Sequence, residues 1–112
     1  LTAAQITEYR HRVKEVHLDA ALIRYIAQIV NNTRSNLSLH LGASPRASLA
    51  IMNTSKALAA MRGRDFVTPE DVKTVTPPVL RHRVMLTPER EMEGIGADDV
   101  VKQILDGIEV PR

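Results

Sequence analysis

The stretch from residue 41 to residue 63 constrains the fold more than any other part of the sequence, because it is rich in alanine and other small residues. Ser44 can cap the free amides at a helix start. Pro45 suits the first helical position, where the N–H that it lacks would have no partner. Gly63 can end the helix in a left-handed conformation. The stretch therefore predicts one long buried helix over 44–62, around which the other elements pack.

Small and apolar side chains recur at helical spacing within this stretch. We expect one buried stripe that consists of Ala47, Ala50, Ile51, Thr54, Leu58 and Met61. Other segments repeat the same spacing, and the side chains expected to be nearly inaccessible to solvent are Leu22, Ile26, Val30, Ile51, Leu58, Val72, Ile104 and Leu105. The core is predicted to be aliphatic, since the chain has one Phe and no Trp.

Arg46 does not fit this packing scheme. A cation in the first turn opposes the positive end of the helix dipole, at a cost within the ~0.3–1 kcal/mol that such charges are worth. A bound anion would offset this cost, because a helix N-terminus with an arginine is suited to phosphate. A solvated arginine is the alternative, and spacing alone favours it.

Four further helices are predicted on either side of the central one, over residues 2–15, 20–33, 68–75 and 98–108. Thr2, Asp19 and Thr68 are suitable N-cap residues for three of them. The predicted fold class is all-α, a small bundle of about five helices with at most a minor two-stranded pairing.

Breaks in the helical pattern complete the expected topology. Pro77 and Pro78 are expected to interrupt or restart the helix that begins at 68, since proline lacks the N–H and clashes with the preceding turn. Residues 16–18 and 83–86 have the character of short extended segments. We expect these two segments to pair, because unpaired backbone groups are costly when they are buried.

The composition argues against several classes of function. Cysteine is absent, so there is no disulfide framework and no thiolate metal site, which fits a reducing compartment such as the cytoplasm. The four histidines lack the spacing of metal ligands, and no metal is expected. No apolar run approaches the ~20 residues that a membrane-spanning helix needs. The net charge of +2 comes from 15 basic and 13 acidic residues, so nucleic acid is not an expected partner.

Three segments together resemble a known family. They are Gly-Ala-Ser-Pro-Arg-Ala at 42–47, Gly-Arg-Asp-Phe-Val-Thr-Pro-Glu-Asp-Val at 63–72 and Val-Leu-Arg-His-Arg-Val at 79–84. In this order they resemble the C-terminal lid of MoxR-type AAA+ ATPases, over about residues 16–112. The resemblance implies one AAA+ lid domain over 1–112, and the start at Leu1 instead of Met leads us to expect a fragment of a longer ATPase. Residues 2–15 would then link the lid to a nucleotide-binding core.

The resemblance also implies a site. In this family the arginine of Gly-Ala-Ser-Pro-Arg is the sensor-2 residue, which contacts the γ-phosphate of ATP, and only Arg46 matches it. Ser44 and Pro45 are further candidates for binding the nucleotide. ATP and Mg²⁺ would be cofactors of the full-length protein, in which alone Arg46 would act in catalysis. No cofactor is expected in the isolated chain.

Partners and activity follow from the same resemblance. The lid would pack on the core domain of its own chain, within a homo-oligomeric ring that the family leads us to expect as a hexamer. ATP hydrolysis by the full-length protein would drive chaperone-like remodelling or maturation of client proteins. The chain itself lacks the phosphate loop Gly-x4-Gly-Lys-Ser/Thr, so we expect it to hydrolyse no ATP alone.

Two other classes of function stay open at this point. A small helical nucleic-acid-binding module could use the basic turns 62–64 and 81–83 to contact phosphates. If 83–86 is a strand, Arg81 and Arg83 would share one face. A plain helical protein-interaction module, with no nucleotide chemistry, is the other alternative.

Overall fold

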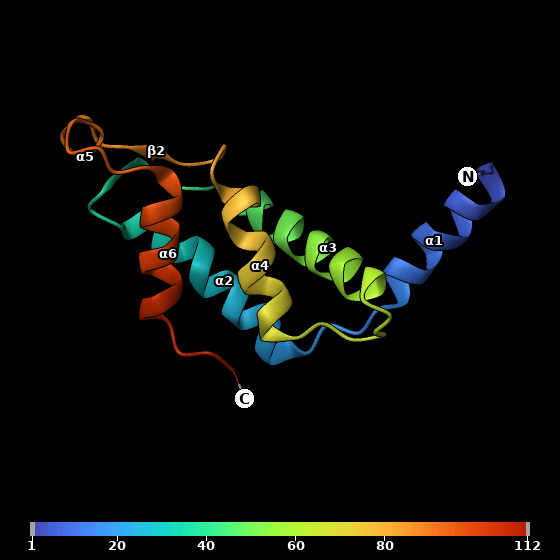
Figure 1. The fold of residues 1–112 in the computed structure, drawn as a ribbon. Coiled ribbons are helices and arrows are strands. Elements are labelled where there is room, and N and C mark those ends of the chain that lie inside the picture. The colour runs from blue at the N-terminus through green and yellow to red at the C-terminus, as the bar shows by residue number, and fades with distance from the viewer. Residues whose placement is uncertain (1, 112) are drawn as a thin grey trace.

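The computed structural model describes residues 2–111. In this part of the chain six helices and two short strands follow one another in the order α1 (Ala3–Glu15), α2 (Ala20–Ser35), β1 (Leu39–Leu41), α3 (Arg46–Met61), α4 (Pro69–Leu80), β2 (Met85–Leu86), α5 (Pro88–Met92) and α6 (Ala97–Gly107). Figure 1 shows the arrangement, and the prediction of a mainly helical bundle with a minor strand pair is confirmed. None of the helices within 2–111 is both long enough and apolar enough to cross a membrane.

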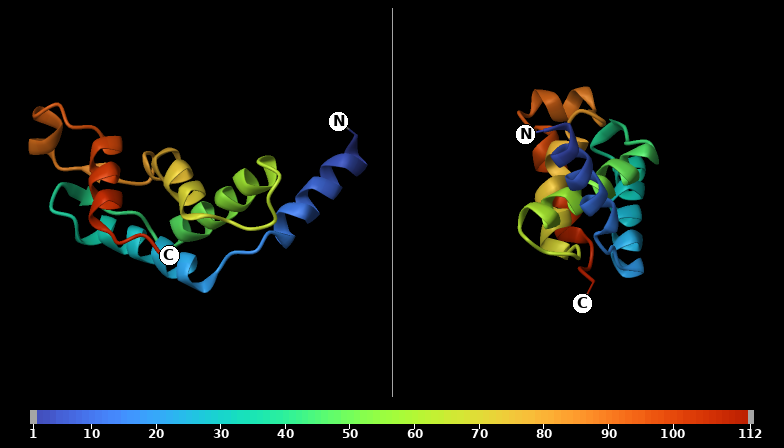
Figure 2. Two further views of the ribbon diagram at one scale, coloured as in Figure 1. Left: turned by 60° about the horizontal axis from the view of Figure 1, so that its bottom comes forward. Right: turned by 90° about the vertical axis from the view of Figure 1, so that its right-hand side faces the viewer.

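The bundle is elongated, with principal extents of 49 × 32 × 21 Å. Helix α3 packs against α2 on one side and α4 on another, and α6 closes the core against α2 and α4. Helix α1 projects away from the other helices, as Figure 2 shows, and all of its residues are exposed or half-buried. The strands and α5 lie at the opposite end of the molecule (Figure 1).

The core is aliphatic, as predicted. Seven of the eight side chains expected to be inaccessible are buried, and they are Leu22, Ile26, Val30, Ile51, Val72, Ile104 and Leu105. Leu58 is the exception, because it is only partly buried at the edge of the core. The strongly amphipathic pattern of α2 and α6 accounts for the success, since each helix has one apolar face and one polar face.

The buried face of α3 differs from the expected stripe. Its fully buried residues recur every fourth position and are Ala47, Ile51, Ser55 and Ala59. Thr54 is exposed and Met61 is 83% exposed, so their expected place in the stripe is wrong. Size explains the difference, because a row of small side chains four residues apart lets a neighbouring helix approach closely. Hydrophobicity alone did not distinguish this row from the neighbouring one.

Helix α4 continues through Pro77 and Pro78, so the expected interruption is wrong. Both prolines lie in the last part of the helix, which ends one turn later at Leu80. Thr76 and Leu80 are fully buried, and their packing holds the last turn in place although the two prolines donate no backbone hydrogen bond. The amide of Arg81 resumes the ladder by donating to the Pro77 carbonyl at 2.9 Å.

The strand pair is present, but its partners were predicted incorrectly. Strand β1 pairs with β2 in antiparallel fashion, with Leu39 opposite Leu86, so residues 16–18 are not the partner of 83–86. Polar residues before β1 hid it in the sequence. The two strands meet because β1 returns from the end of α2 to the side of the turn after α4.

Residues 16–18 pair elsewhere. His17 forms an isolated parallel bridge with Phe66. The His17 amide donates to the Asp65 carbonyl at 2.8 Å, and the His17 carbonyl accepts from the Val67 amide at 2.9 Å. The extended character of this segment was therefore correct, and its hydrogen bonds tie the linker after α1 to the connection between α3 and α4.

Candidate functional site

A shallow hollow of about 640 Å³ lies beside the start of α3. The end of α2, strand β1, the loop before α3 and the turn after α4 contribute its lining, which consists of Arg34, His40, Leu41, Gly42, Ala43, Ser44, Pro45 and Arg83. These lining residues include two arginines and a histidine but no acidic side chain. A concave surface lined by cationic groups attracts anions.

Arg46 is the first residue of α3, at the edge of this hollow. Its side chain is exposed, and it makes no hydrogen bond or ion pair with any residue from 2 to 111. Because no described group neutralises this guanidinium, it can bind an anion that approaches the start of the helix.

The start of α3 carries no side-chain cap, so the predicted capping by Ser44 is wrong. Pro45 occupies the cap position, and the Ser44 carbonyl accepts from the Ala47 amide at 2.9 Å. The physical reason is that Pro45 already has a helical backbone conformation, which leaves the Ser44 side chain one residue too early to cap. The helix therefore presents its positive end without a local acceptor, directly beside Arg46.

The loop before α3 is held against the end of α2. Thr33 is 1% exposed; its hydroxyl donates to the Val30 carbonyl at 2.6 Å and accepts from the Ala43 amide at 2.9 Å. Gly42 lies so close to α2 that an added Cβ would stand 2.5 Å from the Thr33 carbonyl oxygen. Sequence reasoning assigned Thr33 to a polar helix end and missed this contact, because nothing local signals a partner ten residues away.

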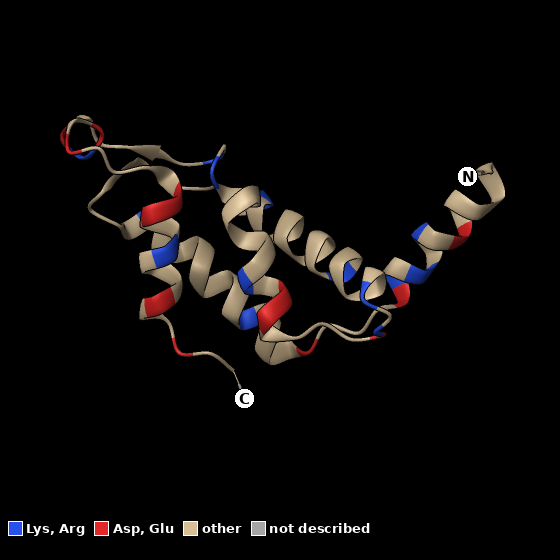
Figure 3. Cartoon of the chain, viewed as in Figure 1, with Lys and Arg blue, Asp and Glu red and all other residues tan. Residues whose placement is uncertain are grey.

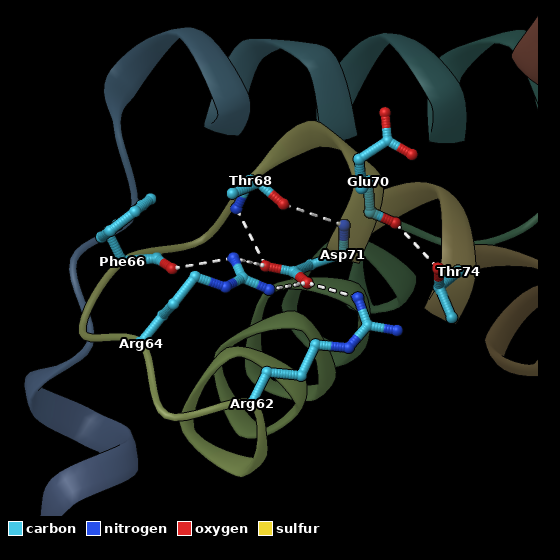
Figure 4. A network of polar contacts seen from close by, with 7 residues as sticks. All are labelled: Arg62, Arg64, Phe66, Thr68, Glu70, Asp71 and Thr74. Atoms are coloured by element: carbon cyan, nitrogen blue, oxygen red, sulfur yellow. Dashed lines mark hydrogen bonds and ion pairs between the residues drawn. The ribbon is translucent and has the colours of Figure 1, made fainter.

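A buried carboxylate joins the end of α3 to the start of α4 (Figure 4). Asp71 is fully buried and accepts hydrogen bonds from Arg64 at 2.6 and 2.7 Å, from Arg62 at 3.2 Å and from the Thr68 amide at 2.9 Å. The Thr68 hydroxyl accepts from the Asp71 amide in return, so the predicted cap at Thr68 is confirmed as a complete capping box.

Opposing effects act on the pKa of Asp71. Burial disfavours the charged form and by itself raises the pKa. Hydrogen bonds from Arg64 and Thr68, together with the positive charge of Arg64, outweigh burial and hold the pKa of Asp71 below its ordinary value. The carboxylate is therefore charged at neutral pH, and it fixes the basic turn that follows α3.

The second basic turn, after α4, is also largely occupied. Arg81 forms two hydrogen bonds with Asp98 at 3.0 and 3.1 Å, and the Arg83 Nε donates to the Val79 carbonyl at 3.2 Å. Strand β2 begins only at Met85, so the expectation that Arg81 and Arg83 share a strand face is wrong. Figure 3 shows acidic residues interspersed with basic ones along the helices, without a continuous basic stripe in that view.

No group of three or more histidine, aspartate or glutamate side chains within the described residues 2–111 could hold a metal ion.

Comparison with known families identifies the class of domain. The profile described as "AAA lid domain" matches residues 31–104, well over half of the chain. The chain belongs to the AAA lid domain family. This match spans the end of α2, the hollow, α3, α4 and most of α6, so it contains the whole site described above.

Individual relatives point to the MoxR type. The chain is 40% identical over 102 residues to the uncharacterized protein YeaC of Bacillus subtilis, an alignment that covers 91% of this chain and 32% of YeaC. It is 39% identical over 101 residues to the chaperone MoxR1 of Mycobacterium tuberculosis, covering 82% of this chain and 27% of MoxR1. The chain thus spans about a third or less of the length of these relatives.

A solved structure agrees with this assignment. The fold superposes on the crystal structure of a candidate ATPase from Cytophaga hutchinsonii with a TM-score of 0.86 and 31% sequence identity. The superposition covers 91% of this chain and 34% of the other. The predicted resemblance to the lid of MoxR-type AAA+ proteins is confirmed.

Proposed function

We propose that this chain is the lid of a MoxR-type ATPase and that it brings Arg46 to the γ-phosphate of bound ATP. The observation that carries the proposal is the exposed, unpartnered guanidinium of Arg46 at an uncapped helix start, beside a hollow without acidic lining. Ser44 and Pro45, which line the hollow, are the neighbouring contacts that we assign to the nucleotide.

An arginine suits this role chemically. Its guanidinium stays charged at all working pH values, and its planar fork matches two phosphate oxygens at once. A cation held in place before the reaction stabilises the charge that develops in the transition state. Motion of the lid toward the core would deliver the guanidinium and exclude water from the phosphate.

The rest of the assembly belongs to the same proposal. The core of the full-length protein would supply the phosphate loop and the acidic residues that hold Mg²⁺, while the lid supplies the arginine. We place this core in the same chain, and we propose a hexameric ring in the cytoplasm that remodels or matures client proteins in a chaperone-like way. The chaperone MoxR1 among the relatives supports this choice of activity.

Nucleic-acid binding is less well supported. Arg62 and Arg64 bond to Asp71, and Arg81 bonds to Asp98, so three of the four arginines in the basic turns already have carboxylate partners. A phosphate backbone would have to compete with these carboxylates.

Hydrolysis by the full-length protein tests the proposal. Arg46→Ala should lower kcat by about 10²–10³, as the loss of one preorganised contact to a transition state does. Arg46→Lys should restore only part of the rate, because a lysine keeps the charge but loses the fork. Arg24→Ala is the matched control, since Arg24 is also an exposed arginine on a helix but lines a different hollow.

Stability of the chain separates the remaining explanations. Arg46→Ala should leave the free energy of unfolding within about ±0.5 kcal/mol, as for most surface changes. A clearly destabilised variant would make Arg46 a structural residue. An unchanged rate of hydrolysis in the full-length protein would make it a solvated one.

A further inference from the structure

We propose that Thr33 and Gly42 are positioning residues that fix the place of Arg46, an inference that rests on the proposed function of Arg46. Neither residue lies in the first turn of α3, and neither would touch a phosphate. They act on the loop that leads into the helix, through one hydrogen bond and one close backbone approach.

The hydrogen bond from the Ala43 amide to the Thr33 hydroxyl holds one end of a short segment. Ala43 is 1% exposed, and the bond is 2.9 Å long. The other end of the segment is Ala47, which is fully buried in α3 and whose amide donates to the Ser44 carbonyl at 2.9 Å. Arg46 stands between these two buried anchors.

The residues between the anchors leave little freedom. Pro45 has a fixed φ, observed at −56°, so the backbone that enters α3 cannot rotate at that bond. The Cα of Arg46 is therefore set by α3 on one side and by the Ala43 contact with α2 on the other. Catalytic geometry is sensitive to such placement, since a shift of about 1 Å can cost on the order of 10²-fold in rate.

Gly42 makes the contact possible. A Cβ at this position would lie 2.5 Å from the Thr33 carbonyl oxygen and 2.6 Å from the Arg34 Cα. Both atoms belong to the backbone of α2, so neither can move aside as the tip of a side chain could. Gly42 is required here for space, and any larger residue would push the loop, and Arg46 with it, away from α2.

Thr76 provides a matched control for Thr33. It is also a fully buried helical threonine, and its hydroxyl donates to the Val72 carbonyl at 2.6 Å. Within residues 2–111 that hydroxyl has no further hydrogen-bond partner, whereas the Thr33 hydroxyl also accepts from Ala43. Replacing either residue by valine removes a buried hydroxyl of the same kind, but only one replacement releases the loop.

Steady-state hydrolysis of ATP by the full-length protein tests the inference. Thr33→Val should lower kcat by about 10-fold to 10²-fold with little change in KM, because the misplaced arginine acts on the transition state. Thr33→Ser keeps the hydroxyl and should stay close to the wild-type rate. Thr76→Val should leave kcat unchanged. Gly42→Ala should reproduce the loss seen with Thr33→Val.

A double mutant isolates the route through Arg46. If Thr33 acts by placing Arg46, adding Thr33→Val to Arg46→Ala should cause no further loss of kcat. Additive losses would overturn the inference, as would equal losses from Thr33→Val and Thr76→Val. If Arg46→Ala itself leaves hydrolysis intact, the proposed function fails and the inference fails with it. If Arg46→Ala lowers hydrolysis but Thr33→Val does not, only the inference fails.

Discussion

Replacing Asp71 by alanine should destabilise this domain strongly. The change removes a fully buried carboxylate that accepts hydrogen bonds from Arg64, Arg62 and the Thr68 amide. Removing one member of a buried ion pair costs ~3–5 kcal/mol, because the partner charge stays behind without compensation. The arginine side chains are 24% and 47% exposed and can recover part of their hydration, so we expect the lower end, about 3 kcal/mol.

Asp98→Ala is the matched control. Asp98 also accepts two hydrogen bonds from one arginine, Arg81, but these two side chains are 57% and 42% exposed. Exposed pairs of this kind contribute ~0.2–1 kcal/mol. Urea denaturation of both variants gives the comparison, with an unchanged m-value as the sign that only stability has changed. Losses of equal size in the two variants would refute the argument from burial.

The pH dependence of stability provides a second reading of the same group. The pKa of Asp71 is lowered in the folded chain, so the folded state favours the charged form more than the unfolded state does. Its contribution is therefore fully present above about pH 4, the ordinary range for an aspartate, and is lost as the pH falls through the folded pKa. The stability difference between wild type and Asp71→Ala should shrink on acidification below about pH 4, and a constant difference would contradict the assignment.

Three further outcomes are expected. In urea denaturation, Ile51→Ala should cost about 2–5 kcal/mol and Leu58→Ala less, because Ile51 is fully buried and Leu58 only partly; the reverse order would contradict the packing of α3. Gly63→Ala should lower stability by about 1 kcal/mol, since φ is +76° there, whereas Gly107→Ala, with open space around an added Cβ, should be neutral or slightly stabilising in thermal melting. The isolated chain should release no phosphate from ATP above background, and turnover that survives Arg46→Ala would show that the domain has been misread.

Local signals in the sequence predicted much of the fold. The amphipathic patterns of α2 and α6 identified their buried faces, and the caps at Thr2, Asp19, Thr68 and Gly63 are all present in the structure. Each of these features depends on residues a few positions apart, so the sequence alone specifies it.

Features that depend on distant partners could not be predicted in the same way. Strand β1 is defined by its pairing with β2, and its own residues have no strong strand pattern. The buried face of α3 depends on which small side chains meet the neighbouring helices. The burial of Asp71 was missed because an acid in a first helical turn is usually solvated, and here Arg64 and Arg62 enclose it.

The candidate site shows the same division. The resemblance led to Arg46, Ser44 and Pro45, and the structure places Ser44 and Pro45 in one hollow with Arg46 at its edge. The contribution of Thr33 is visible only in the structure, because its hydroxyl meets the Ala43 amide across a turn between two helices. Spacing within one element carries no information about such a contact.

The structure of the full-length protein with a non-hydrolysable ATP analogue and Mg²⁺ is the most direct test of the central claim. The account predicts that the lid closes on the nucleotide and that Arg46 donates hydrogen bonds to oxygens of the γ-phosphate, at about 2.7–2.9 Å. The same position should be empty of such a contact with ADP, which has no γ-phosphate. A closed, ATP-bound state in which the Arg46 side chain points into solvent, or pairs with a carboxylate of the core, would contradict the account.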